Sequence, residues 1–251
     1  MTVPILSLDH VDFAYRADRP VLTDVSLAIA PGESVVLVGE SGAGKSSLLQ
    51  LALGLRAPTR GTVHFEGAPL PTRRVALRAF RRAVQPIYQD PFSSLDPRMK
   101  VGDAIAEPLR SLGIEGDRRA RVAGLLADVG LPADAAERYP DAFSGGQRQR
   151  IAIARALAPS PRLLLADEPV SALDTSVRMQ VIDLLRSLAR ERGIGMLLVS
   201  HDLTIVSALC ARIAVLEGGR IVEVGETAEV LSHPQHPYTA RLLASVPRLP
   251  L

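Results

Sequence analysis

The chain has 251 residues, 47% of them hydrophobic, which allows one large or two small domains with an ample core. The formal net charge is only +2 and is spread evenly, which argues against a nucleic-acid partner, and the single cysteine, Cys210, excludes an internal disulfide and a cysteine-based metal site. No apolar run approaches about 18 residues and no leader-like segment opens the chain, so we expect a soluble cytoplasmic protein that reaches a membrane only through a partner.

Strand patterns fill the N-terminal part of the chain. Apolar residues alternate through residues 3–29, and Pro31-Gly32 predicts a turn. A continuous apolar run at 34–38 then predicts a buried strand, and a helix is predicted at 45–53. A glycine-rich loop joins the last strand to this helix.

That loop matches the phosphate-binding pattern G-x-x-x-x-G-K-[ST]. Its residues are Gly39, Glu40, Ser41, Gly42, Ala43, Gly44, Lys45 and Ser46, followed by Ser47. Glycines let backbone N–H groups turn toward phosphate oxygens, and the following helix adds the positive end of its dipole. Lys45 is expected to reach the β- and γ-phosphates, and the Ser46 hydroxyl to ligate Mg²⁺. The alternative, an ordinary strand–turn–helix corner, leaves unexplained why one of only two lysines in this arginine-rich chain stands here.

The middle of the chain is mostly helical. A short strand is predicted near 61–65, followed by a helix with arginines at 73, 74, 78, 81 and 82, which we interpret as a solvated face. Helical periodicity then extends over 103–158, with breaks near 113–116, 130–132 and 139–140.

Within this helical stretch lies a second candidate anion site, Phe143-Ser144-Gly145-Gly146-Gln147. Ser144 and Gln147 have the spacing of a capping box, so they could simply begin a helix. Capping does not explain two successive glycines, each of which costs a helix about 1 kcal/mol relative to alanine. Bare backbone at a helix N-terminus suits a phosphate, and we expect it to serve a nucleotide bound by a partner subunit.

A buried strand is predicted at 163–166, and two acids, Asp167 and Glu168, follow it. Ligands of parallel sheets bind at this carboxyl end, so Asp167 is expected to hold Mg²⁺ through water and Glu168 to activate the attacking water. Solvated acids capping a strand are the alternative. Pro169 predicts an extended Glu168.

Further strands are predicted at 196–200, 213–216 and 220–224, with a helix at 176–190. Strands that alternate with helices indicate an α/β fold with a parallel sheet, interrupted by a helical insertion.

The order of these motifs resembles the ATP-binding cassette (ABC) ATPases over nearly the whole chain. The resemblance implies a P-loop NTPase (RecA-like) core with an N-terminal antiparallel β-subdomain and an inserted α-helical subdomain. One nucleotide-binding domain would span 1–251, with the core at about 1–89 and 159–225, the helical subdomain at about 90–158 and a short tail at 226–251. Further roles are implied for Tyr15 (adenine stacking), Gln89 (sensing Mg²⁺ and water), Asp174 (bridging two subunits) and His201 (γ-phosphate contact). Tyr15 could instead be an ordinary sheet residue, and His201 a structural one.

The family implies two ATPase subunits, head to tail, that sandwich two ATP molecules with Mg²⁺; the second subunit would be a different, related chain or a second copy of this one. Each site would combine Lys45 and the loop of one subunit with Ser144, Gly145, Gly146 and Gln147 of the other.

Three segments are similar to importers for peptides and nickel, namely 88–99 (YQDPFSSLDPRM), 167–174 (DEPVSALD) and 236–243 (HPYTARLL). Such importers combine two related ATPases, two permeases and an extracytoplasmic binding protein, with the ATPases on the inner face of the membrane. Tyr88 and Phe143 stand where Phe and Leu are commoner, and the cysteine-rich tail of many peptide-transport ATPases is absent. That brevity resembles nickel and metallophore members, so the solute stays open. His233 and His236 could suggest a metal site, but Pro234 and Pro237 favour turn and helix-start chemistry.

Two other functions remain as alternatives. ABC-type ATPases also act in nucleic-acid repair and in translation, usually with coiled coils, zinc modules or a second cassette that this chain lacks. The second alternative is a regulatory or structural subunit that does not hydrolyse ATP, although every expected motif residue is present.

Overall fold

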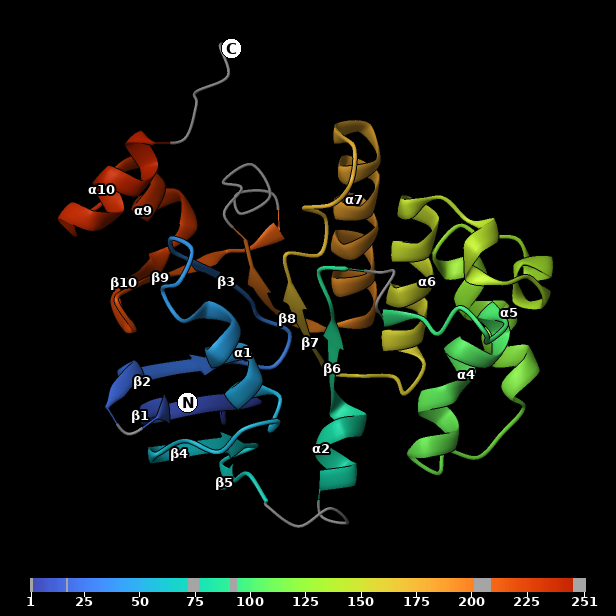
Figure 1. The fold of residues 1–251 in the computed structure, drawn as a ribbon, viewed down its shortest axis with the longest axis horizontal. Helices are drawn as coiled ribbons and strands as arrows, with labels where there is room; N and C mark the ends of the chain where they lie inside the picture. Colours follow the sequence, from blue (N-terminus) through green and yellow to red (C-terminus); the bar gives the residue numbers. More distant parts are fainter. Residues whose placement is uncertain (1, 17, 72–76, 91–93, 201–208, 246–251) are drawn as a thin grey trace. The chain divides into compact units, whose positions relative to one another are not determined.

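The structure is a computed structural model that describes residues 2–16, 18–71, 77–90, 94–200 and 209–245 (Figure 1). Its backbone divides into two compact units. The first unit comprises residues 1–71 and 195–251, and the second comprises residues 72–194.

An antiparallel sheet forms the N-terminal part of the first unit, with strand order β2-β1-β4-β5. Leu8 in β1 lies opposite Leu27 on one neighbouring strand and Val63 on the other, and all three side chains are buried. The alternation predicted from the sequence therefore places one apolar face toward the core. The strands are β1 (Leu6–Arg16), β2 (Arg19–Ile29), β4 (Arg60–Phe65) and β5 (Ala68–Pro69).

The remaining strands of this unit are arranged in the order β10-β9-β3-β8. β3 lies parallel to both β8 and β9, and its residues Val35, Val36, Leu37 and Val38 are all buried, as expected for a central strand covered on both faces. The phosphate loop lies between the end of β3 and the beginning of α1. These elements and the C-terminal helices are β3 (Ser34–Val38), β8 (Gly195–Val199), β9 (Arg212–Glu217), β10 (Arg220–Glu226), α1 (Lys45–Ala52), α9 (Thr227–Ser232) and α10 (Pro237–Ala244).

The second unit contains two parallel strands, β6 and β7, and the helical segment that connects them. Ile105 and Leu109 of α4, Leu126 of α5 and Ile153 of α6 form its buried apolar faces. Its elements are α2 (Leu77–Ala83), β6 (Val84–Ile87), α4 (Val101–Ser111), α5 (Arg118–Asp128), the short 3₁₀ helices η1 (Ala133–Glu137) and η2 (Pro140–Ala142), α6 (Gly145–Leu157), β7 (Leu163–Asp167) and α7 (Thr175–Arg192).

The predicted α/β organisation is confirmed, including the helical insertion between β6 and β7. Arg78, Arg81 and Arg82 are exposed, as a solvated face requires, whereas Arg73 and Arg74 lie outside the described residues. The predicted division into core, helical subdomain and tail stays a prediction. No helix among the described residues is both long enough and apolar enough to cross a membrane.

Candidate functional site

The phosphate loop depends on two glycines that no other residue could replace. A Cβ at position 39 would lie 2.3 Å from the carbonyl oxygen of Leu216 in β9. Gly44 has a φ of 107°, and a Cβ there would lie 2.8 Å from Leu22 Cδ2. Gly42 also has a left-handed φ, of 83°, but its Cβ position faces open space, since no described residue apart from its two chain neighbours has an atom within 4 Å of it. The loop is therefore packed tightly at its two ends and open in the middle, as a phosphate cradle requires.

Lys45 and the serines after it begin α1. The Lys45 ammonium donates hydrogen bonds to the carbonyl oxygens of Gly39, at 2.8 Å, and of Glu40, at 2.7 Å. Ser46 is exposed, so its hydroxyl fits the expected contact with Mg²⁺. Ser47 is buried, and its Oγ lies 3.1 Å from the hydroxyl oxygen of Tyr15.

Tyr15 lies in β1, which agrees with the sheet alternative, yet 53% of the residue is exposed. Its hydroxyl donates to Gln50 Oε1 at 3.3 Å, which ties the ring to α1. The Arg56 guanidinium carbon lies 5.3 Å from the ring centroid, within the range of a cation–π contact. An exposed ring fixed beside the helix of the phosphate loop is compatible with adenine stacking, which stays a prediction.

Glu168 overturns one expectation. Its φ is 41°, in the left-handed region, so the predicted extended conformation is wrong. The reason is a turn that begins directly after β7, in which the Glu168 carbonyl accepts hydrogen bonds from Ser171 N–H at 3.2 Å and Ser171 Oγ at 3.1 Å. Pro169 occupies the second position of this turn, where its fixed φ is favourable. A non-glycine residue in the left-handed region costs about 1–2 kcal/mol, and such strain is frequent at functional sites.

The turn brings Glu168 together with Gln89, 79 positions earlier in the sequence. Gln89 Nε2 donates to Glu168 Oε2 at 3.2 Å and to Ser171 Oγ at 3.3 Å. The predicted water-activating carboxylate and the predicted water-sensing amide are therefore in direct contact. Asp167, the last residue of β7, directly precedes Glu168 and is half-buried. The sequence analysis missed Ser171, although it stands in the quoted segment 167–174.

The second glycine motif has two separate explanations. The capping box is present, because Ser144 Oγ accepts from Gln147 N at 3.4 Å and Gln147 Oε1 accepts from Ser144 N at 3.0 Å. A Cβ at Gly146 would lie 2.2 Å from Val177 Cγ1 of α7, so packing alone requires that glycine. At Gly145 the nearest atom would be 3.8 Å away, which is ordinary contact. Gly145 is the position that the packing leaves unexplained, and a ligand role for it stays a prediction.

Asp174 precedes α7 as its N-cap residue, but its side chain makes no capping hydrogen bond and is exposed. An exposed carboxylate at this position remains accessible to another subunit. His201, the predicted γ-phosphate contact, lies outside the described residues.

The histidines near the C-terminus do not form a metal site in the described part of the chain. His236 begins α10 as its N-cap, accepting from Tyr238 N at 3.3 Å, and Pro237 follows at the first helical position. His233 Nδ1 lies 3.0 Å from Ser232 Oγ. Among the described residues, no group of three or more His, Cys, Asp or Glu side chains is placed to hold a metal. The N-cap position of His236, with Pro237 after it, confirms the predicted helix start at these two residues.

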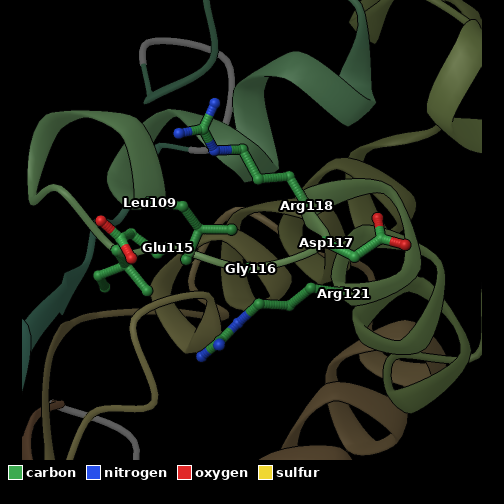
Figure 2. A pocket seen from close by; sticks show the side chains of 7 residues that line it. Leu109, Glu115, Gly116, Asp117, Arg118 and Arg121 are labelled. Carbon is green, nitrogen blue, oxygen red and sulfur yellow. The ribbon is translucent and has the colours of Figure 1, made fainter.

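Two hollows are present in the second unit. The smaller one has a volume of 160 Å³ and is lined by residues of α4, α5 and their connection, among which the Arg118 and Arg121 side chains diverge (Figure 2). The larger one, of 660 Å³, lies among α4, α5 and η1. Two ion pairs, Lys100–Glu137 and Arg110–Asp103, take up much of its charge. Neither hollow contains a residue predicted to bind nucleotide.

Comparison with known families gives two matches. The ABC transporter family matches residues 22–171. The C-terminal region of oligopeptide and dipeptide transporters matches residues 222–250, which include α9 and α10.

Named relatives agree with these matches. The glutathione import ATP-binding protein GsiA of Escherichia coli K12 is 51% identical over 226 residues, which cover 89% of this chain but only 36% of that protein. The chain thus spans about a third of the length of this relative. A Brucella ovis protein, provisionally named a peptide import ATP-binding protein, is 45% identical over 97% of this chain and 79% of its own length.

Solved structures agree with the fold. A Clostridium perfringens component of an ABC transporter complex has a TM-score of 0.82 at 27% identity, covering 92% of this chain and 91% of its own. An ATP-binding cassette in a dimeric post-hydrolysis state, bound to ADP and phosphate, has a TM-score of 0.79 at 30% identity, covering 88% and 98%. These similarities confirm the P-loop NTPase fold, and the alternative functions in nucleic-acid repair or translation are not favoured.

Proposed function

Because the chain belongs to the ABC transporter family, we propose that it hydrolyses ATP to drive the import of small peptides through partner permeases. The single observation that carries the catalytic part is the contact between Gln89 Nε2 and Glu168 Oε2 at the end of β7. It joins an amide that can orient water to a carboxylate that can take its proton, on a backbone held under strain.

In the first unit, the phosphate loop is the proposed binding element for ATP. The backbone N–H groups of the loop and the Lys45 ammonium would bind the β- and γ-phosphates, and Lys45 would give up its bonds to the Gly39 and Glu40 carbonyls to do so. These donors also stabilise the charge that spreads over the γ-phosphoryl group during transfer. Tyr15 is the proposed stacking partner of adenine.

In the second unit, Glu168 is the proposed general base. It would accept a proton from the water whose oxygen attacks the γ-phosphorus, while Gln89 orients that water. Ser46 and Gln89 would hold Mg²⁺ through their side-chain oxygens and Asp167 would hold it through water, and the ion would neutralise negative charge on the phosphates. Such an ion takes many of its ligands from phosphates and water, so a compact cluster of acidic side chains is not needed. His201 is proposed to contact the γ-phosphate.

A second, related ATPase subunit is part of the proposal. Gly145 at the N-terminus of α6, with Ser144, Gly146 and Gln147, would approach the nucleotide held by that subunit's phosphate loop. The room at Gly145 and the exposed carboxylate of Asp174 support this arrangement.

The remaining proposed partners are two membrane permeases and an extracytoplasmic binding protein, with this chain on the cytoplasmic face of the membrane. The segment that follows Gln89 is the proposed dock for the permeases. Its described part is 94–99, in which residues 96–99 form a turn: Asp96 Oδ1 accepts from Arg98 N at 2.9 Å, and Arg98 is exposed. Residues 91–93 lie outside the described part of the chain.

We favour peptides over nickel or a metal chelate as the solute, since the matched C-terminal region is that of oligopeptide and dipeptide transporters. The test is uptake into sealed vesicles that contain the co-purified complex in a known orientation. ATP-dependent uptake of labelled di- and tripeptides, with no uptake of labelled nickel and none with Lys45→Ala, is the expected result. Uptake of nickel alone would contradict the solute, and peptide uptake by Lys45→Ala would contradict the ATPase.

A further inference from the structure

The C-terminal helix α10 reaches the phosphate loop through one buried tyrosine. The Tyr238 hydroxyl accepts a hydrogen bond from Glu40 N–H at 2.9 Å, although the two residues are 198 positions apart in the sequence. Tyr238 is only 4% exposed, so its ring is fixed by packing. A partly buried backbone N–H that lost this acceptor would carry a desolvation penalty. The contact therefore satisfies a backbone group of the loop that the loop itself leaves unpaired.

The peptide group that Tyr238 contacts is also the one that holds the catalytic lysine. The carbonyl of Gly39 and the N–H of Glu40 belong to the same peptide plane, and Lys45 Nζ donates to that carbonyl at 2.8 Å. The carbonyl end of this plane thus contacts the Lys45 ammonium, and its N–H end contacts the Tyr238 hydroxyl. Rotation of the plane would break both bonds, and the charged donor polarises the peptide so that its N–H becomes a better donor.

Two carboxylates on β9 and β10 anchor α10 in this position. Glu223 accepts hydrogen bonds from Gln235 N at 2.8 Å and His236 N at 3.1 Å, and Glu217 accepts one from Arg241 Nη2 at 3.3 Å. Partial burial tends to raise the pKa of Glu223, but the nearby Thr239 side chain and the hydrogen bonds from these two N–H groups outweigh it, so the pKa is lowered.

The same strand supports the loop itself. Leu216, next to Glu217 in β9, is the residue whose carbonyl oxygen leaves no room for a side chain at Gly39. The helix and the phosphate loop are therefore both held by the end of β9, and Tyr238 closes the connection between them.

We propose that Tyr238 is a positioning residue for the phosphate loop, which makes the C-terminal helix part of the nucleotide site. The inference rests on the proposed function in one respect, namely that Lys45 exchanges the Gly39 carbonyl for phosphate oxygens when ATP binds. Once ATP is bound, the hydrogen bond from Glu40 N–H to the Tyr238 hydroxyl would still restrain the 39–40 peptide plane. A loop restrained in this way loses less conformational freedom on binding, which raises affinity for ATP without any contact between the tyrosine and the nucleotide.

The test compares Tyr238→Phe, which removes only the hydroxyl, with the matched control Tyr139→Phe at an exposed tyrosine in the second unit. Two measurements are made on the full chain: hydrogen–deuterium exchange of the peptide covering the phosphate loop without added nucleotide, and the Kd for ATP. For Tyr238→Phe we expect loop exchange and Kd to increase by about 2- to 10-fold, the usual worth of one hydrogen bond. In the assembled complex, KM for ATP should rise while kcat is unchanged, because only binding is affected.

Several outcomes would overturn the proposal. If Tyr238→Phe matches Tyr139→Phe in both loop exchange and Kd, the hydroxyl has no positioning role. If exchange also accelerates throughout β1 and β2, the substitution acts through general destabilisation. Lys45→Ala, measured in parallel, separates this inference from the proposed function: ATP binding that survives Lys45→Ala contradicts the ATP site, whereas ATP binding lost in Lys45→Ala but unchanged in Tyr238→Phe contradicts only the role of Tyr238.

Discussion

Replacement of Glu168 by glutamine tests the proposed chemistry with little disturbance of the fold. The side chains have the same size, and a glutamine oxygen could still accept the hydrogen bond that Gln89 Nε2 now donates at 3.2 Å. The backbone of residue 168, with its φ of 41°, would be strained equally by either residue. The difference is that glutamine, unlike glutamate, cannot accept a proton from water.

The expected loss follows from that role. A positioned general base is worth about 10²- to 10⁴-fold in rate, which corresponds to about 3 to 5 kcal/mol in activation free energy. ATP binding should remain, because the phosphate loop is untouched. The ATP-bound pair of subunits should persist, because the hydrolysis that opens it is slowed.

The assay is steady-state ATPase activity of the assembled complex, together with ATP affinity and subunit association by sedimentation. Glu66→Gln is a matched control, since Glu66 also has a left-handed φ, of 52°, and is exposed in the β4–β5 connection. Normal turnover is expected for the control. Near-normal turnover of Glu168→Gln, with the complex intact, would refute the assignment of Glu168 as the base.

Three further predictions concern two neighbouring glycines, two glutamines of one helix and the cysteine. Gly146→Ala should lower the free energy of unfolding by about 1–3 kcal/mol in urea titrations, because its methyl group overpacks the adjacent helix. Gly145→Asp should instead fold normally, bind ATP at its own phosphate loop and block hydrolysis at the partner subunit's loop. Loss of ATP binding only at its own loop would contradict the shared site. Gln149 is fully buried, and neither the nitrogen nor the oxygen of its amide has a hydrogen-bond partner among the described residues, so Gln149→Met should raise the unfolding free energy by about 1–3 kcal/mol. Gln147→Met on the same helix should lower the unfolding free energy, because it removes half of the capping box. A lower Tm for Gln149→Met would show that the amide is paired. Burial raises the pKa of the Cys210 thiol to about 12, so the native protein should not react with a thiol reagent at pH 8 until it is unfolded. Rapid labelling of the native protein would contradict the burial of this thiol.

Local patterns in the sequence were sufficient for the elements and for the identity of the main motifs. The strand before the phosphate loop, the helix after it and the capping box at Ser144 were all predicted, and the structure contains them. Each depends on residues a few positions apart, where periodicity, glycine content and capping chemistry act directly. The order of the motifs was enough to indicate the family.

Contacts between distant residues were decided only by the tertiary structure. The contact of Glu168 with Gln89 joins residues 79 positions apart, and the requirement for glycine at position 146 follows from Val177 on another helix. The tail motif at His236 was visible in the sequence, but nothing near it indicated that Tyr238 would bond to the amide of Glu40. Sequence patterns report which face of an element is apolar, whereas packing selects which distant residue that face meets, so the partners of Glu168, Gly146 and Tyr238 emerged only in the folded chain.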